Sequence, residues 1–123
     1  MIELNELRLV LIQELKNFRY QEKQLPNYQQ LCRFLMVKPP NSIAKLTSAL
    51  EQLMLEDHLA QQPQLAAVCV QKRKPVPREG FFQYLSELGL YSGPDKGNQA
   101  EIWHIRELDK LCEFYAHLLE KPI

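Results

Sequence analysis

The stretch from Pro63 to Gly89 constrains the fold of this 123-residue chain more than any other segment. It begins with a short apolar run, Leu65–Val70, and continues into a basic segment that contains Pro75 and Pro77. A short apolar run with β-branched residues, bounded by a proline, favours a buried strand over a helix. The two later prolines exclude a regular helix, because proline lacks the backbone N–H and clashes with the preceding turn. The sequence therefore predicts a strand within an otherwise helical chain.

A strand needs a partner, because a single strand is not stable alone. Three partners remain open for the predicted strand: Arg19–Leu25, Lys74–Val76, or a segment of another subunit. We therefore expect an α+β fold that is mainly helical and winged-helix-like, with about five helices and a short strand or small sheet.

Helical periodicity accounts for most of the remaining chain. Apolar residues recur at the spacing of an amphipathic helix in five segments. These segments are residues 3–18, 27–36, 42–59, 81–88 and 100–120. Asn27 and Gln30 form a predicted capping box at the start of the second helix, and Gly89 is placed to end the fourth. The side chains predicted to face inward from the first and last helices are Leu4, Leu7, Leu11, Leu15, Phe18, Ile105, Leu108, Leu111, Cys112, Tyr115, Leu118 and Leu119.

The composition is that of an ordinary globular domain. Hydrophobic residues make up 46% of the chain and charged residues 24%, which is close to the average for folded domains. Lys and Arg together number 15, as do Asp and Glu, so the formal net charge is zero. We expect one domain over residues 1–123, with a winged-helix-like core at 20–89 and a C-terminal packing helix at 99–120.

The cysteines and the first residues predict the cellular compartment. Cys32, Cys69 and Cys112 lie too far apart for a structural zinc site, and three free thiols favour a reducing environment. Glu3 and Glu6 stand where a signal peptide needs positive charge. No apolar run has the length of a membrane span. We therefore expect a cytoplasmic protein with no membrane partner.

The two helices predicted at 27–36 and 42–59 are followed by the predicted strand and the basic loop, which is the order of a winged helix-turn-helix. In that fold the second helix enters the major groove of DNA and the wing contacts phosphates. The exposed face of the 42–59 helix would present Ser42, Lys45, Ser48 and Gln52 to the bases. The alternative is that the two helices only scaffold a core.

The loop at residues 71–78 holds the main local concentration of positive charge. Lys72, Arg73, Lys74 and Arg78 lie close together there. Prolines restrict the loop, so that it loses little backbone entropy on binding. We expect these side chains to contact nucleic acid or an acidic protein surface, or else to form a solvated loop tip.

Three aromatic residues are candidates for a subunit interface. Phe82, Trp103 and Tyr115 are large side chains of the kind that dominate such contacts, and they would support a homodimer. The alternative is that all three pack within their own domain.

Motifs for catalysis or metal binding are missing from the sequence. Glu101 and His104 form one Glu-x-x-His pair, and a carboxylate-bridged metal site needs a second copy. There is no nucleophile elbow and no phosphate-binding glycine loop. We therefore assign no catalytic residue, no metal and no cofactor.

Several short motifs together resemble a known type of domain. They are Tyr28-x-x-Leu31, Pro63-x-Leu65-Ala66-Ala67-Val68-x-Val70 and Pro77-x-x-Gly80-Phe81-Phe82. The pattern resembles a small uncharacterised prokaryotic winged-helix-like domain found in phage- and restriction-associated proteins, and it covers most of residues 20–115. That pattern often has a second glycine where this chain has Arg78. The resemblance implies a winged-helix fold in a nucleic-acid context, and it supplies no catalytic residue.

Two functions follow as expectations. The first is a module that binds nucleic acid weakly through the 42–59 helix and the 71–78 loop. The alternative is a protein-interaction or homodimerisation module with no role in nucleic-acid binding. Nucleic-acid-binding domains usually carry a basic excess, so with a net charge of zero any nucleic-acid binding must rest on an uneven distribution of charge.

Overall fold

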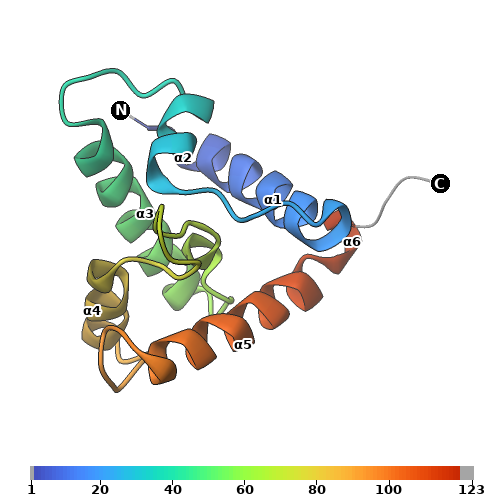
Figure 1. Cartoon of the computed structure of the whole chain (residues 1–123), viewed down its shortest axis with the longest axis vertical. Helices are drawn as coiled ribbons and strands as arrows, with labels where there is room; N and C mark the ends of the chain where they lie inside the picture. The colour runs from blue at the N-terminus through green and yellow to red at the C-terminus, as the bar shows by residue number, and fades with distance from the viewer. Residues whose placement is uncertain (1, 120–123) are drawn as a thin grey trace.

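The structure, a computed structural model, describes residues 2–119 and consists of helices joined by loops (Figure 1). Within those residues the helices are α1 (Leu4–Gln21), α2 (Tyr28–Phe34), α3 (Ser42–Leu59), the short 3-10 helix η1 (Leu65–Val68), α4 (Glu79–Glu87), α5 (Asn98–Phe114) and α6 (Ala116–Leu119). No strand occurs among the described residues. The predicted α+β, winged-helix-like fold is therefore wrong.

The helix predictions are largely confirmed. The bounds of α3 are those predicted, and Asn27 and Gln30 form the predicted capping box at α2. Gly89 follows α4 with a positive φ of 78°, a conformation that glycine adopts easily. The predicted final helix is instead two, because the chain breaks at Tyr115 between α5 and α6. Glu120, its predicted last residue, lies outside the described residues.

The predicted strand at Leu65–Val70 is instead the 3-10 helix η1 followed by an extended end. Its contact with an extended segment is an isolated parallel bridge between Val70 and Asn27, in which the Val70 N–H donates to the Pro26 carbonyl over 3.0 Å. Of the three proposed partner segments, Arg19–Leu25 ends immediately before this contact. The run stays buried without a sheet because its polar backbone groups find acceptors and donors on neighbouring helices.

Polar side chains from two helices cap η1. The Gln64 N–H donates to Glu107 Oε2 over 2.7 Å, and the Leu65 N–H donates to Asp57 Oδ2 over 3.1 Å. At the other end His104 Nε2 lies 2.8 Å from the Ala67 carbonyl oxygen, so the Nε2 tautomer must carry the proton to donate. Carboxylates at the first N–H groups of a helix are favourable for its dipole.

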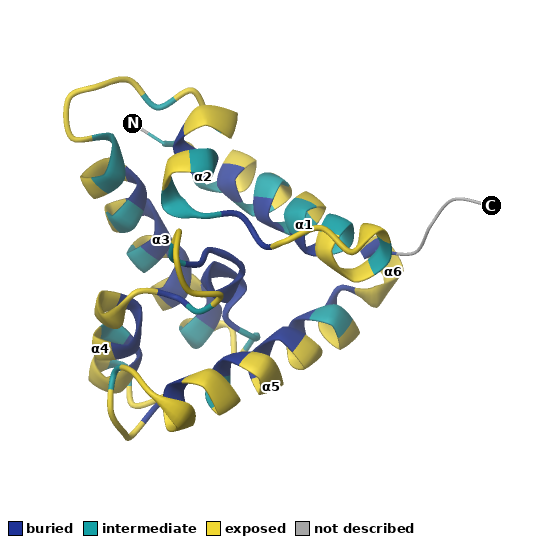
Figure 2. Cartoon of the chain, in the orientation of Figure 1, coloured by how far each residue is buried: buried dark blue, intermediate teal, exposed yellow. Residues whose placement is uncertain are grey.

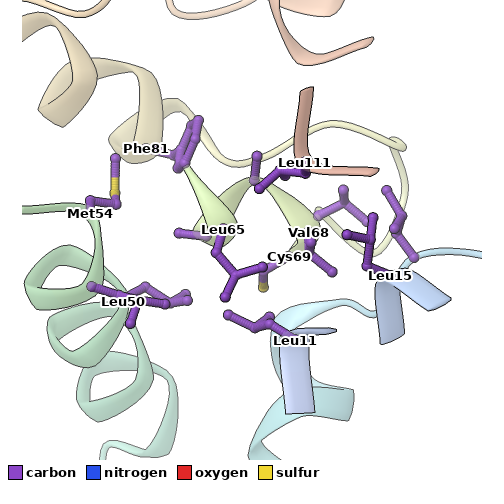
Figure 3. Close-up of a cluster of buried hydrophobic side chains, with 14 of the residues drawn as sticks. Leu11, Leu15, Leu50, Met54, Leu65, Val68, Cys69, Phe81 and Leu111 are labelled. Carbon is purple, nitrogen blue, oxygen red and sulfur yellow. The ribbon is translucent and has the colours of Figure 1, made fainter. Parts of the chain in front are cut away.

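The segment Leu65–Val70 lies at the centre of the hydrophobic core (Figure 3). Side chains from four helices surround it. Figure 3 shows Leu11 and Leu15 from α1, Leu50 and Met54 from α3, Phe81 from α4 and Leu111 from α5 around Leu65, Val68 and Cys69. Figure 2 shows the same arrangement as buried faces of α1, α3 and α5 turned toward the middle of the molecule.

The helix α1 belongs to this core, as the spacing of its leucines predicted. Leu7, Leu11 and Leu15 are all fully buried. The carboxylate of Asp57, which caps η1, is paired with Arg8 on α1 over 2.8 Å. Hence α1 contributes both apolar and ionic contacts to the centre of the fold. None of the helices between residues 2 and 119 combines the length and apolar character needed to cross a membrane.

Candidate binding groove

A groove of about 870 Å³ lies between α1, α2 and α5, with the loop after η1 as a further wall. The end of α1 and the segment that follows it contribute Phe18 and Lys23, while α2 contributes Phe34. The loop contributes Lys72, Arg73 and Lys74, and α5 contributes Ile105. The groove therefore joins residues that are far apart in the sequence. In Figure 1 the loop lies in the middle of the view, with α1 and α2 on one side and α5 on the other.

Hydrogen bonds close the base of the loop at residues 71–78. The Gln71 N–H donates to the Val76 carbonyl over 2.9 Å, and the Gln71 side-chain amide donates to the Pro77 carbonyl over 3.2 Å. Pro77 itself is buried, whereas residues 72–75 are exposed. The base is thus fixed to the fold, and it presents the basic tip to solvent at the groove.

Three apolar side chains that line the groove are exposed to solvent. Phe18 is 37% exposed, Phe34 51% and Ile105 60%. The helical periodicity predicted that Phe18 and Ile105 would face inward, and this prediction is wrong. Both residues lie where the neighbouring helices do not cover them. Exposed apolar side chains that converge in a concave site are typical of binding sites.

The groove carries an excess of positive charge. Four basic side chains line it, from Lys23 and residues 72–74, against two acidic ones, Glu14 and Glu101. Burial raises the pKa of Glu14, while its hydrogen bond with Asn17 and the charge of Lys23 lower it. Within residues 2–119, none of the three basic side chains at 72–74 has a carboxylate at ion-pair distance.

The site residues predicted on α3 do not belong to this groove. Lys45, Ser48 and Gln52 are exposed and Ser42 is half-buried, but no described residue of α3 lines the groove. The ammonium group of Lys45 donates to the Lys38 carbonyl over 2.9 Å, in the turn before α3. The structure therefore does not join the two halves of the predicted nucleic-acid surface in one groove.

Arg78 is also separate from the other three basic residues of its loop. Its guanidinium lies 5.1 Å from the centre of the Tyr28 ring, and the backbone N–H of Arg78 donates to the Tyr28 hydroxyl over 3.3 Å. Both contacts hold the loop to α2. Arg78 is absent from the lining of the groove, and its contacts are those of a structural residue.

The predicted interface aromatics pack within the chain. Phe82 is 1% exposed and Tyr115 is buried. Trp103 is half-buried in a cluster with Phe81, Phe82 and Tyr91, at ring-centre distances of 5.8, 5.9 and 6.2 Å. Edge-to-face geometries of this kind stabilise a core. Phe82 and Tyr115 therefore have almost no surface to offer to a second subunit.

The side chains that could bind a metal ion or act in catalysis have structural roles. Among residues 2–119 there is no cluster of three or more His, Cys, Asp or Glu side chains that could hold a metal ion. Burial raises the pKa of Cys69 well above its ordinary value, and a buried thiol of raised pKa is a poor nucleophile. His104 contacts the Ala67 carbonyl at the end of η1. Burial lowers the pKa of His104, although this contact acts to raise it.

A second depression, of about 640 Å³, lies between α1, α3 and α6. Its one arginine, Arg8, is already paired with Glu56 over 3.1 Å and with Asp57 over 2.8 Å. This depression therefore offers a partner less free positive charge than the groove does.

Sequence reasoning missed Lys23 and Phe34 as site residues and treated Phe18 as core. One signal was available for Phe34, because it lies outside the apolar stripe of Leu31 and Leu35 on its own helix. No local signal distinguished Phe18 or Lys23, since their exposure in the groove depends on where α5 and the loop lie.

Comparisons with protein-family models, with curated proteins and with solved structures found no match. The resemblance to a prokaryotic winged-helix-like domain therefore stays an expectation, and the sheet that it implied is not part of this fold. The site must be interpreted from its own geometry.

Proposed function

We propose that this protein is a protein-interaction module that holds a segment of a partner protein in the groove between α1, α2 and α5. The observation that carries this proposal is that Phe18, Phe34 and Ile105, all exposed, line one concave site. Covering these side chains would remove apolar surface from water, which is the main driving force of association.

The groove supports a binding role better than a catalytic one. Its polar lining consists mainly of amides and exposed cations, including Asn17, Gln24 and Gln30. Its one histidine, His104, already contacts the Ala67 carbonyl, Glu14 already accepts a hydrogen bond from Asn17, and Glu101 is exposed to solvent. General acid–base catalysis needs a titratable group free to reach a reacting proton. A groove that combines exposed apolar side chains with amides and cations is instead suited to recognition.

The test is selection of a phage-displayed library of random peptides on the purified protein. The groove variant Phe34→Ser with Ile105→Ser removes two exposed apolar side chains at the site. A matched control, Leu55→Ser with Leu59→Ser, removes two exposed leucines of α3 that do not line the groove. Because all four side chains are exposed, each variant should change stability little.

We expect enriched peptides to bind the unmodified protein and the α3 control, and to lose at least about tenfold in affinity for the groove variant, or about 1.4 kcal/mol. Peptides that bind all three proteins equally would contradict the proposal. So would a library from which no peptide is enriched. Thermal melts of both variants show whether they remain folded.

A further inference from the structure

We infer that the partner segment held in the groove is acidic, with carboxylate side chains next to apolar ones. This inference rests on the proposed function and names the chemistry of its partner. It follows from the way charge and apolar surface are combined in the groove, and from the state of the basic side chains before binding.

The charge of the groove is complementary to that of an acidic segment. The chain as a whole has no net charge, yet the groove is lined by four basic and two acidic side chains. The positive excess is therefore local to this site. Complementary potentials across an interface speed association and exclude partners of the wrong charge.

The cations of the loop are available to a partner. In the part of the chain that the structure describes, Lys72, Arg73 and Lys74 form no ion pair. A partner carboxylate would thus gain an interaction without breaking one within the protein. By contrast, the arginine of the second depression, Arg8, would first have to leave Asp57.

Contacts within the chain hold the loop in place before binding. The hydrogen bonds from Gln71 to the Val76 and Pro77 carbonyls close its base, and Arg78 is fixed on Tyr28. Ordering of a flexible loop would subtract from the binding free energy, and a loop already closed at its base avoids much of that loss.

The lining favours an acidic protein segment over a nucleic acid. Glu14 and Glu101 lie in the same groove as the cations. Their negative charges repel a nucleic acid, which carries a phosphate at every nucleotide. A peptide can place its carboxylates beside residues 72–74 and a neutral side chain beside each glutamate. A peptide can also place aliphatic side chains against Ile105. Ile105 has no aromatic ring on which a nucleobase could stack.

The experiment uses three synthetic peptides of about twelve residues, a length that suits a groove-sized epitope. The first combines glutamates with leucine and phenylalanine. The second replaces each glutamate with lysine, and the third replaces each apolar residue with serine. A fourth probe, an oligothymidylate of similar length, represents nucleic acid. Binding of each is measured by fluorescence anisotropy at low and moderate salt.

Two charge-reversal variants complete the experiment. Lys72→Glu with Lys74→Glu reverses the charge at the groove. The matched control, Lys38→Glu with Lys45→Glu, reverses two exposed lysines that do not line it and that, among the described residues, form no ion pair. We expect the acidic apolar peptide to bind at least about tenfold more tightly than the lysine peptide. We also expect the variant Lys72→Glu with Lys74→Glu to lose about tenfold in affinity for the acidic peptide. The control variant should remain within about twofold, since distant exposed charges are screened.

The outcomes separate this inference from the proposed function. Equal binding of the glutamate and lysine peptides, with both weakened by Phe34→Ser and Ile105→Ser, would overturn the acidic partner and leave the docking groove intact. Tighter binding of the oligothymidylate, lost in Lys72→Glu with Lys74→Glu, would overturn the inference in favour of nucleic acid. Peptide binding unaffected by both groove variants would overturn the groove itself. Failure of the acidic peptide to bind at about millimolar concentration would also overturn the inference.

Discussion

Replacement of Glu107 by alanine tests whether side-chain capping is what allows η1 to lie in the core. The carboxylate accepts the Gln64 N–H over 2.7 Å, and both residues are buried. Without the carboxylate, the Gln64 N–H has lost its acceptor at a site that is 2% exposed. The same change leaves the α5 backbone and the apolar side of the helix as they are.

The expected cost is about 2 kcal/mol. A buried donor left without a partner costs about 1–3 kcal/mol. Burial raises the pKa of Glu107, while the Gln64 N–H and Lys110 act in the opposite direction, so the native carboxylate is itself held at some cost. Removing it recovers part of that cost, which keeps the total near the middle of the range. For a domain of this length, about 2 kcal/mol lowers the melting temperature by about 8 °C.

The assay is equilibrium urea denaturation, supported by thermal melts. Glu107→Gln keeps an oxygen that can accept the Gln64 N–H, and we expect it to lose less than half as much stability as Glu107→Ala. Glu113→Ala, at an exposed position of the same helix, should change the free energy of unfolding by no more than about 0.5 kcal/mol. If Glu107→Ala is as stable as Glu113→Ala, or if Glu107→Gln is as unstable as Glu107→Ala, the capping argument is wrong.

Two further predictions concern the core. Burial lowers the pKa of His104 below its ordinary value, so the imidazole binds a proton more readily in the unfolded chain than in the folded one. The free energy of unfolding should therefore fall as the pH drops from about 7.5 to about 5.5, by at most about 1.4 kcal/mol per pH unit. Urea titrations across this range should show a shallower fall for His104→Gln, and an equally steep fall would contradict the assignment. Leu11→Ala should cost about 3 kcal/mol because it leaves a cavity beside η1, whereas Leu9→Ala, at a residue that is 68% exposed, should cost under about 0.5 kcal/mol. Similar urea midpoints for the two leucine variants would refute the placement of α1 in the core.

The helices were predictable because their signals are local. In α3, apolar residues at i, i+3 and i+4 between prolines and polar turns were sufficient to place both ends. In α2 the Asn27–Gln30 capping box lies within one turn of the chain, so its geometry depends little on distant residues.

The strand prediction failed because its decisive partners are distant in sequence. An apolar run such as Leu65–Val70 satisfies the pattern of a buried strand, and only the acceptors around it decide its backbone. Those acceptors are Glu107 and Asp57, while His104 donates to its other end. Two of these three residues come from a helix that begins near position 98, and no window around residue 65 contains them.

The groove was unpredictable for a related reason. Helical periodicity identifies an apolar face, but it does not show whether a neighbour covers the whole face. Phe18 lies in the last turn of α1, and Ile105 lies beside the buried face of α5, which includes His104, Leu108 and Leu111; neighbouring elements leave both residues exposed.

By itself, the sequence determined where most helices of this protein form, because helical signals depend on neighbours along the chain. It also determined that the charge is balanced and that Lys72, Arg73, Lys74 and Arg78 lie close together. The tertiary structure alone decided that Leu65–Val68 is a 3-10 helix, that Phe82 and Tyr115 are interior, and that Phe18, Phe34 and Ile105 meet the loop cations in one groove. These outcomes depend on which elements cover one another, and burial and hydrogen bonding between distant residues are properties of the assembled fold.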